Sequence, residues 1–239
     1  MSWLVLLIAT PLLTAAGYFS GLPWLLPLLE VLPAYPLMVG DLKRDKPCAA
    51  LGKMMLWALL LAATVETMTV ISPQAGESSV FHGTSYRDEM LSWIRTGSGK
   101  ESIPARFLPE HALHLGAFVA LSILSGSLLS LLLGAVLMNY MSFYVGSLLG
   151  IARDSHVILL AGWPPWAIAR VAAFVTLGVL LAGPMLKRFG RVPFRWEGKR
   201  PWLLAAAAGI VLDVFLKTLL APRWSELLRA ALYPLSPGL

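Results

Sequence analysis

Apolar blocks long enough to cross a membrane recur along this chain from Ser2 to Leu220, and most charged residues fall in the gaps between them. A transmembrane helix needs about twenty predominantly apolar residues. The chain has 239 residues, of which 57% are hydrophobic and only 13% charged, whereas a soluble domain carries about 25% charged residues. The sequence therefore predicts an all-α, polytopic transmembrane helix bundle embedded in the lipid bilayer, with residues 1–239 forming one domain.

The apolar blocks predict six or seven spans. Ser2–Tyr18 is expected to be a retained first span, and the four prolines of Gly21–Gly40 permit either one span or a broken, re-entrant pair. The long run Ala112–Ala152 must hold two passes, or one pass and a re-entrant turn, with the reversal expected at Asn139 and Tyr140. The other predicted segments are the spans Met54–Ile71, Ala167–Leu186 and Trp202–Leu219 and an amphipathic surface tail, Arg223–Leu232.

The distribution of basic residues predicts the orientation. Lys and Arg are enriched in the cytoplasmic loops of membrane proteins, and they dominate residues 41–53 and 187–200, whereas residues 72–110 are nearly balanced. We therefore expect a protein of the cell inner (plasma) membrane with a cytoplasmic N-terminus, a basic cytoplasmic loop at 187–200 and an exoplasmic loop at 72–110. The net charge of +6 belongs to these loops, so no nucleic-acid partner is expected.

Small residues recur at every fourth position in Ser122, Gly126, Ser130 and Gly134. On one helix this spacing forms a groove, and in lipid such grooves let a second backbone approach closely. The pattern predicts tight helix packing within the chain, in a homo-oligomer, or with a partner membrane protein. A pore lining is the less favoured interpretation.

The expected exoplasmic loop contains a short amphipathic helix and a group of polar residues. Ser85 begins a capping-box pattern, and Tyr86–Arg95 is expected to lie in the interface as a lid or as an ordinary connector. Where the chain re-enters the membrane, Glu110, His111 and His114 fall on neighbouring positions of a helix. A carboxylate beside an imidazole suits acid/base or metal chemistry. The candidate residues are therefore Glu110, His111 and His114 for catalysis and His82 for binding, with plain interfacial histidines as the alternative.

Further ionisable residues interrupt the apolar sequence. Arg153, Asp154 and His156 are either binding residues or part of a hydrated turn at the interface. Asp213 and Lys217 are further candidate binding residues; they lie four residues apart in the last span, so they are expected to pair across one helical turn.

The spacing of Asp213 and Lys217 is similar to that in the last helix of microbial rhodopsins, where the Lys forms the retinal Schiff base. The resemblance covers only these few residues. The preceding span, Ala167–Leu186, lacks the Trp and Tyr that line the retinal pocket of that family. These departures favour a structural ion pair between Asp213 and Lys217 over a retinal site. The sequence therefore identifies no cofactor, and any metal is unknown.

Two functions remain open. The protein is expected to transport a small solute or lipid, or to serve as a helix-packing subunit of a membrane complex, because no Walker motif or nucleophile elbow is present. The alternative is a membrane-interface enzyme that acts on a lipid or lipid-linked substrate through the Glu110, His111 and His114 group.

Overall fold

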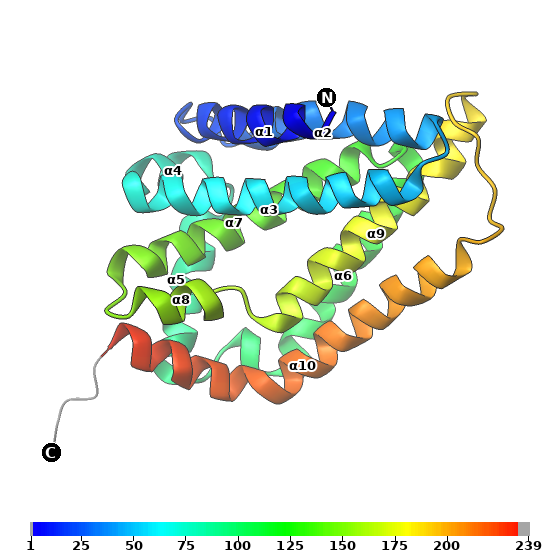
Figure 1. The fold of residues 1–239 in the computed structure, drawn as a ribbon. Helices are drawn as coiled ribbons and strands as arrows, with labels where there is room; N and C mark the ends of the chain where they lie inside the picture. Colours follow the sequence, from blue (N-terminus) through cyan, green and yellow to red (C-terminus); the bar gives the residue numbers. More distant parts are fainter. Residues whose placement is uncertain (1, 234–239) are drawn as a thin grey trace, which may run out of the picture.

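The computed structural model describes residues 2–233, which form ten α-helices, one 3-10 turn and no strand (Figure 1). Six of these helices are long and apolar enough to cross a membrane, which confirms the prediction of an all-α, multi-pass integral membrane protein. The six are α2 (Leu25–Lys43), α3 (Pro47–Ile71), α6 (Pro104–Ser125), α7 (Leu128–Ile151), α9 (Pro165–Arg188) and α10 (Arg200–Leu232). The shorter elements are α1 (Ser2–Tyr18), α4 (Pro73–Ser79), α5 (Gly83–Thr96), the 3-10 turn η1 (Lys100–Ser102) and α8 (Ser155–Ala161).

Helices α1 and α2 form a close antiparallel hairpin. A Cβ atom on Gly17 would lie 2.8 Å from the Cα atom of Leu26, so only glycine permits this approach. Helix α2 runs unbroken with Pro33 and Pro36 inside it. The re-entrant alternative for this segment is therefore wrong. Packing against α1, α3 and α7 compensates for the helical hydrogen bonds that the prolines remove.

The chain reverses at Gly126 and Ser127, between α6 and α7, and not at Asn139 and Tyr140 as predicted. Both turn residues have positive φ angles, 60° and 69°. The Ser127 hydroxyl donates to the carbonyl of Gly178 at 2.6 Å, which ties the buried turn to α9 well before that helix ends. Asn139 lies inside α7, where its polar side chain faces a buried carboxylate and marks no turn.

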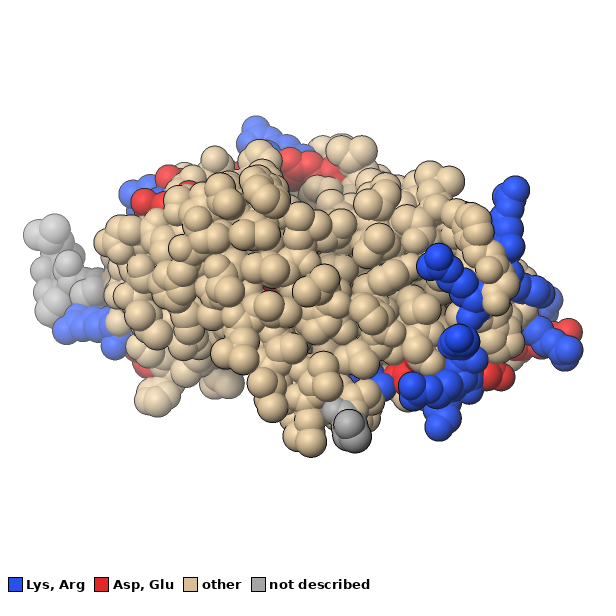
Figure 2. All heavy atoms as spheres, turned by 90° about the horizontal axis from the view of Figure 1, so that it is seen from above, with Lys and Arg blue, Asp and Glu red and all other residues tan. Residues whose placement is uncertain are grey.

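The bundle has two chemically different ends. The α2–α3 turn and the α9–α10 loop lie at one end (Figure 1), and Figure 2 shows Lys and Arg gathered there beside the largely uncharged face of α1 and α2. The other end carries α4, α5, α8 and the last turns of α10. We call these the basic end and the polar end.

Helix α10 is longer than any span needs. Its 33 residues would extend about 50 Å, compared with a hydrocarbon thickness of about 30 Å. The predicted surface tail is its continuation: the helix contains Pro222 and changes direction along its length (Figure 1). Its last turns pack against α8 at the polar end, where the Trp224 indole donates to the carbonyl of Ala161 at 2.8 Å.

The predicted interfacial helix is present as part of α5, which begins at Gly83. Ser85 therefore lies inside the helix and does not cap it. Met90, Trp93 and Ile94 form its buried face, and this face packs against α7 and α10. Helix α5 thus covers the polar end of the bundle.

Candidate functional site

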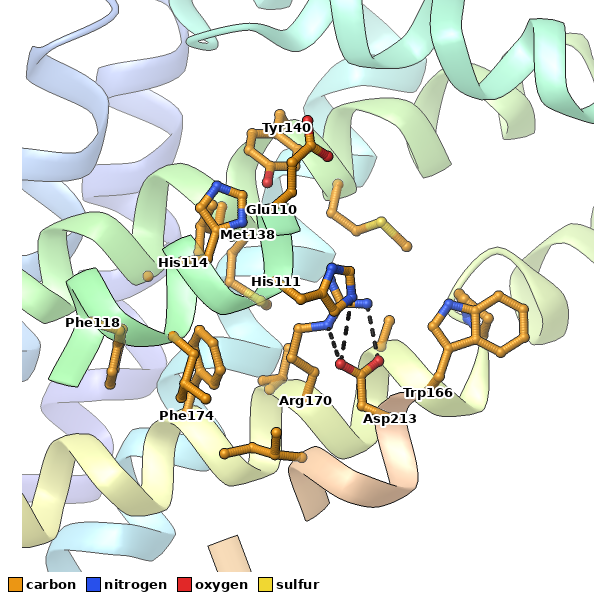
Figure 3. Close-up of a pocket in the computed structure, with 18 of the residues that line it drawn as sticks. Glu110, His111, His114, Phe118, Met138, Tyr140, Trp166, Arg170, Phe174 and Asp213 are labelled. Carbon is orange, nitrogen blue, oxygen red and sulfur yellow. Dashed lines mark hydrogen bonds and ion pairs between the residues drawn. The ribbon is translucent and has the colours of Figure 1, made fainter. Parts of the chain in front are cut away.

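A cavity of about 320 Å³ lies among α3, α5, α6, α7, α9 and α10, near the polar end (Figure 3). Its volume falls in the range of small-molecule binding sites, about 300–1,000 Å³. Most of its lining is apolar or aromatic. The charged and polar lining residues gather on one side and are Tyr86, Glu101, Glu110, His111, His114, Tyr140, Arg170 and Asp213.

An ion pair between α9 and α10 forms the centre of the polar side. Arg170 donates from Nε and Nη2 to the two carboxylate oxygens of Asp213 at 2.9 and 3.1 Å. The Asp213 side chain is only 2% exposed. Two-point pairing of this kind is strong and directional, and it offsets the cost of placing both charges among apolar helices.

His111 approaches this ion pair from α6 (Figure 3). Its Nε2 atom lies 3.6 Å from Asp213 Oδ2, which is beyond hydrogen-bond distance. The same nitrogen is buried and has no hydrogen-bond partner within the described part of the chain, while the ring packs on Phe107 with centroids 5.2 Å apart. His111 therefore presents a free ring nitrogen beside a carboxylate and a guanidinium.

Lys217 pairs with Glu101 of η1 at 2.8 Å, and its Nζ lies 4.5 Å from the centroid of the Phe107 ring. The expected pairing of Asp213 with Lys217 is therefore wrong. Each residue binds a partner from another element: Asp213 binds Arg170 of α9, and Lys217 binds Glu101 of η1.

Lys100 links two carboxylates at the outer rim of the cavity. It donates to Glu110 at 2.8 Å and lies 3.6 Å from Glu89. The hydrogen bond to Glu110 raises the pKa of the Lys100 ammonium group. On α5, burial raises the pKa of the Tyr86 phenol, which donates to the sulfur of Met141 at 3.3 Å. The phenol is therefore neutral at physiological pH.

The inner part of the cavity is apolar. Phe118 of α6 and Phe174 of α9 stack with ring centroids 4.8 Å apart, and Leu137 and Gly134 of α7 face the same space. The absence of a side chain at Gly134 leaves room there, since even a Cβ atom added at this position would lie 3.6 Å from the Phe118 ring. The cavity thus passes from charged groups to aliphatic and aromatic ones.

The structure brings together only some of the residues predicted for a site. The cavity is lined by Glu110, His111, His114 and Asp213. Lys217 does not line the cavity but binds Glu101, which does. His82, Arg153 and His156 are exposed and do not line it. Asp154 caps the start of α8 by accepting the amide N–H groups of His156 and Val157 at 3.1 and 3.3 Å.

The four small residues do not form a stripe on one helix. Ser122 lies in the last turn of α6, Gly126 occupies the turn between the helices, and Ser130 and Gly134 lie on α7. The hydroxyls of Ser122 and Ser130 are hydrogen-bonded to each other at 2.8 Å across the turn. The pattern therefore joins α6 to α7 and forms no single-helix groove.

Two residues important to the cavity, Arg170 and Glu101, were not predicted from the sequence. Arg170 is the one charged residue inside the apolar run Ala167–Leu186. A charge at such a position usually marks function or a partner, so this signal was available. Glu101 carried no signal, because it lies in an ordinary polar loop whose position only the fold decides.

Comparison with protein-family models, with curated proteins and with solved structures finds no match for this chain. Within residues 2–233, no three His, Cys, Asp or Glu side chains are grouped as ligands for a metal ion. The functional inference therefore depends on the cavity and on the Arg170–Asp213–His111 group.

Proposed function

We propose that the protein binds an amphipathic lipid or lipid-linked molecule in this cavity and transports it or presents it within the membrane. The observation that carries the proposal is the division of the cavity into a charged side and an apolar side. Amphiphiles have this same division. The volume of about 320 Å³ suits a headgroup and the first part of a chain, with the rest of the chain remaining in the bilayer.

The charges restrict the headgroup. Three carboxylates, those of Glu101, Glu110 and Asp213, line the cavity with one guanidinium, that of Arg170. Lys100 and Lys217 balance two of these carboxylates from outside. A headgroup that both donates and accepts hydrogen bonds, such as a sugar or a zwitterionic group, matches this lining better than a multiply charged anion.

The proposed orientation places the basic end in the cytoplasm, following the bias of Lys and Arg toward the inside. In this orientation the N-terminus is also cytoplasmic. Helix α1 is antiparallel to α2, and Trp3 near its start contacts Lys53 near the start of α3, with 5.6 Å from the ring centroid to Nζ. The cavity would lie in the outer half of the inner membrane.

Lipid binding is tested by filling the apolar part of the cavity. Leu137→Trp should remove co-purified lipid, measured by native mass spectrometry of protein in a mild detergent. The matched control is Leu129→Trp, on the exposed face of the same helix. Retention of the same lipid by a folded Leu137→Trp protein would contradict the proposal.

A membrane-interface enzyme is the second candidate, and the unpartnered His111 Nε2 beside Asp213 favours it. A general acid or base contributes about 10²–10⁴-fold in rate. In proteoliposomes made from a lipid extract, His111→Ala should reduce conversion of a lipid by this factor at unchanged thermal stability. His82→Ala, outside the cavity, is the control. Bound lipid without conversion by the wild type would favour transport.

A further inference from the structure

A second buried polar group lies deep between α1, α2, α3 and α7, behind Trp57. At its centre is Glu30, whose side chain is fully buried. The Asn139 amide donates to its Oε2 atom at 2.7 Å. The Trp57 indole, which also lines the cavity, donates to the main-chain carbonyl of Glu30 at 2.9 Å.

Glu30 differs from the other buried carboxylates in having no basic partner. Asp41 is paired with Lys53 and Asp213 with Arg170, whereas no Lys, Arg or His among residues 2–233 forms an ion pair with Glu30. An unpaired carboxylate in an apolar interior is costly. The group must therefore either hold a proton or be matched by a cation from outside the chain.

Four buried side-chain oxygens in this region have no hydrogen-bond partner among residues 2–233. They are the hydroxyls of Thr10 and Thr14, Oε1 of Glu30 and Oδ1 of Asn139. Their residues are all at least nine-tenths buried, with exposed fractions of 0–2%.

The two threonines are also unusual among those of this protein. Helical threonines commonly donate to the carbonyl four residues earlier. Those that do so here are Thr64, Thr67, Thr69, Thr96, Thr176 and Thr218. Thr10 and Thr14 make no such bond, so their hydroxyl oxygens remain available on the buried face of α1.

The register of the α1–α2 hairpin places the residues that carry these oxygens on facing helix surfaces. Gly17 lies against Leu26, so in antiparallel helices Thr14 faces Glu30 one turn further along. Thr10 follows on the same face, opposite Pro33. Pro33 has no N–H to offer the carbonyl of Leu29, which leaves another oxygen beside Glu30 without its helical donor. Asn139 completes the group from α7.

We propose that Glu30, Thr10, Thr14 and Asn139 bind one sodium ion inside the membrane. A single carboxylate among neutral oxygens matches one positive charge, whereas calcium sites use several carboxylates. A proton on Glu30 would engage only one acceptor, while a small hard cation contacts several oxygens at once. The ion would join the α1–α2 hairpin to α7, and the site is independent of the lipid proposal.

The experiment measures thermal unfolding of the purified full chain in detergent by tryptophan fluorescence. Sodium, potassium and choline chlorides are compared at equal ionic strength, and binding of radioactive sodium is measured in parallel. We expect saturable stabilisation by sodium above that by choline. Glu30→Gln should abolish both the stabilisation and the binding.

Thr14→Val decides the outcome if Glu30→Gln does not fold. It keeps the carboxylate and should weaken sodium binding by about tenfold or more, as loss of a supporting metal-site group does. Thr64→Val is the control, because its hydroxyl bonds only to its own helix. Absence of any sodium effect on the wild type, stabilisation by acid alone, or undiminished sodium binding in both the Glu30 and Thr14 variants would overturn the proposal.

Discussion

Two groups of buried charge lie inside this bundle, and their charges are balanced in opposite ways. At the polar end, Asp213 is held by Arg170, and Lys217 by Glu101, so the protein supplies both signs. Deeper in the bundle, Glu30 has only neutral neighbours, of which Asn139 is one. The first group is complete and adjoins a cavity, whereas the second needs a cation from outside the chain. Burial alone therefore does not define what a charged residue in a span does.

The largest expected effect concerns the side of the membrane that each end faces, because labelling is all-or-none. In a Cys48→Ser background, Ser98→Cys should react with an impermeant maleimide from outside, and Glu197→Cys only from inside. Both positions are exposed. Labelling of both from one side would overturn the proposed orientation and the crossing of the membrane by α6, α7 and α9, which lie between these two positions.

Breaking the ion pair between Arg170 and Asp213 should strongly destabilise the folded protein. Arg170→Met removes the two-point partner of the buried Asp213 and leaves only His111 Nε2, 3.6 Å away. Loss of one member of a buried pair costs about 3–5 kcal/mol. The double variant Arg170→Met with Asp213→Leu should recover most of this stability in thermal unfolding but not lipid binding. If the double variant is as unstable as Arg170→Met, unpaired charge is not the cause of the loss.

The same kind of change at Glu30 should have the opposite sign. In sodium-free buffer, Glu30→Gln removes the cost of keeping an unpaired carboxyl group in the apolar interior and keeps an oxygen for the Asn139 amide, so stability should rise by about 1–3 kcal/mol. The thermal unfolding midpoint measures this rise. A clear fall would mean that Glu30 has a positive partner in the protein and would remove the contrast between the two groups.

The smallest effect is expected at the exposed rim. Lys100→Ala removes an ion pair in which both side chains are about half exposed, so the free energy of unfolding should fall by less than about 1 kcal/mol. Because the pKa of Lys100 is raised in the folded protein, its contribution is present below the ordinary lysine value and is lost as the pH rises through the folded pKa. Unfolding midpoints of both proteins should therefore converge in strongly alkaline buffer.

Part of the candidate site was predictable, because its signals are local. Glu110, His111 and His114 stand one helical turn apart at a membrane boundary, and any α6 would place them together. Asp213 was identified as a charge in a span, but its partner was not, since Arg170 is on another helix. The expected reversal at Asn139 failed because a polar residue inside a span signals either a turn or a buried partner, and its neighbours in sequence do not distinguish the two.

The sequence by itself determined that the chain is a helical membrane protein, where most of its spans lie, and which end is basic. These properties follow from hydrophobicity and charge counted along the chain, because the bilayer requires each span to satisfy its own backbone. Only the tertiary structure decided which charges are paired. Arg170 meets Asp213, Glu101 meets Lys217, and Glu30 meets only neutral neighbours such as Asn139. Such pairing depends on helix register and rotation, which small contacts like that of Gly17 with Leu26 set across the bundle.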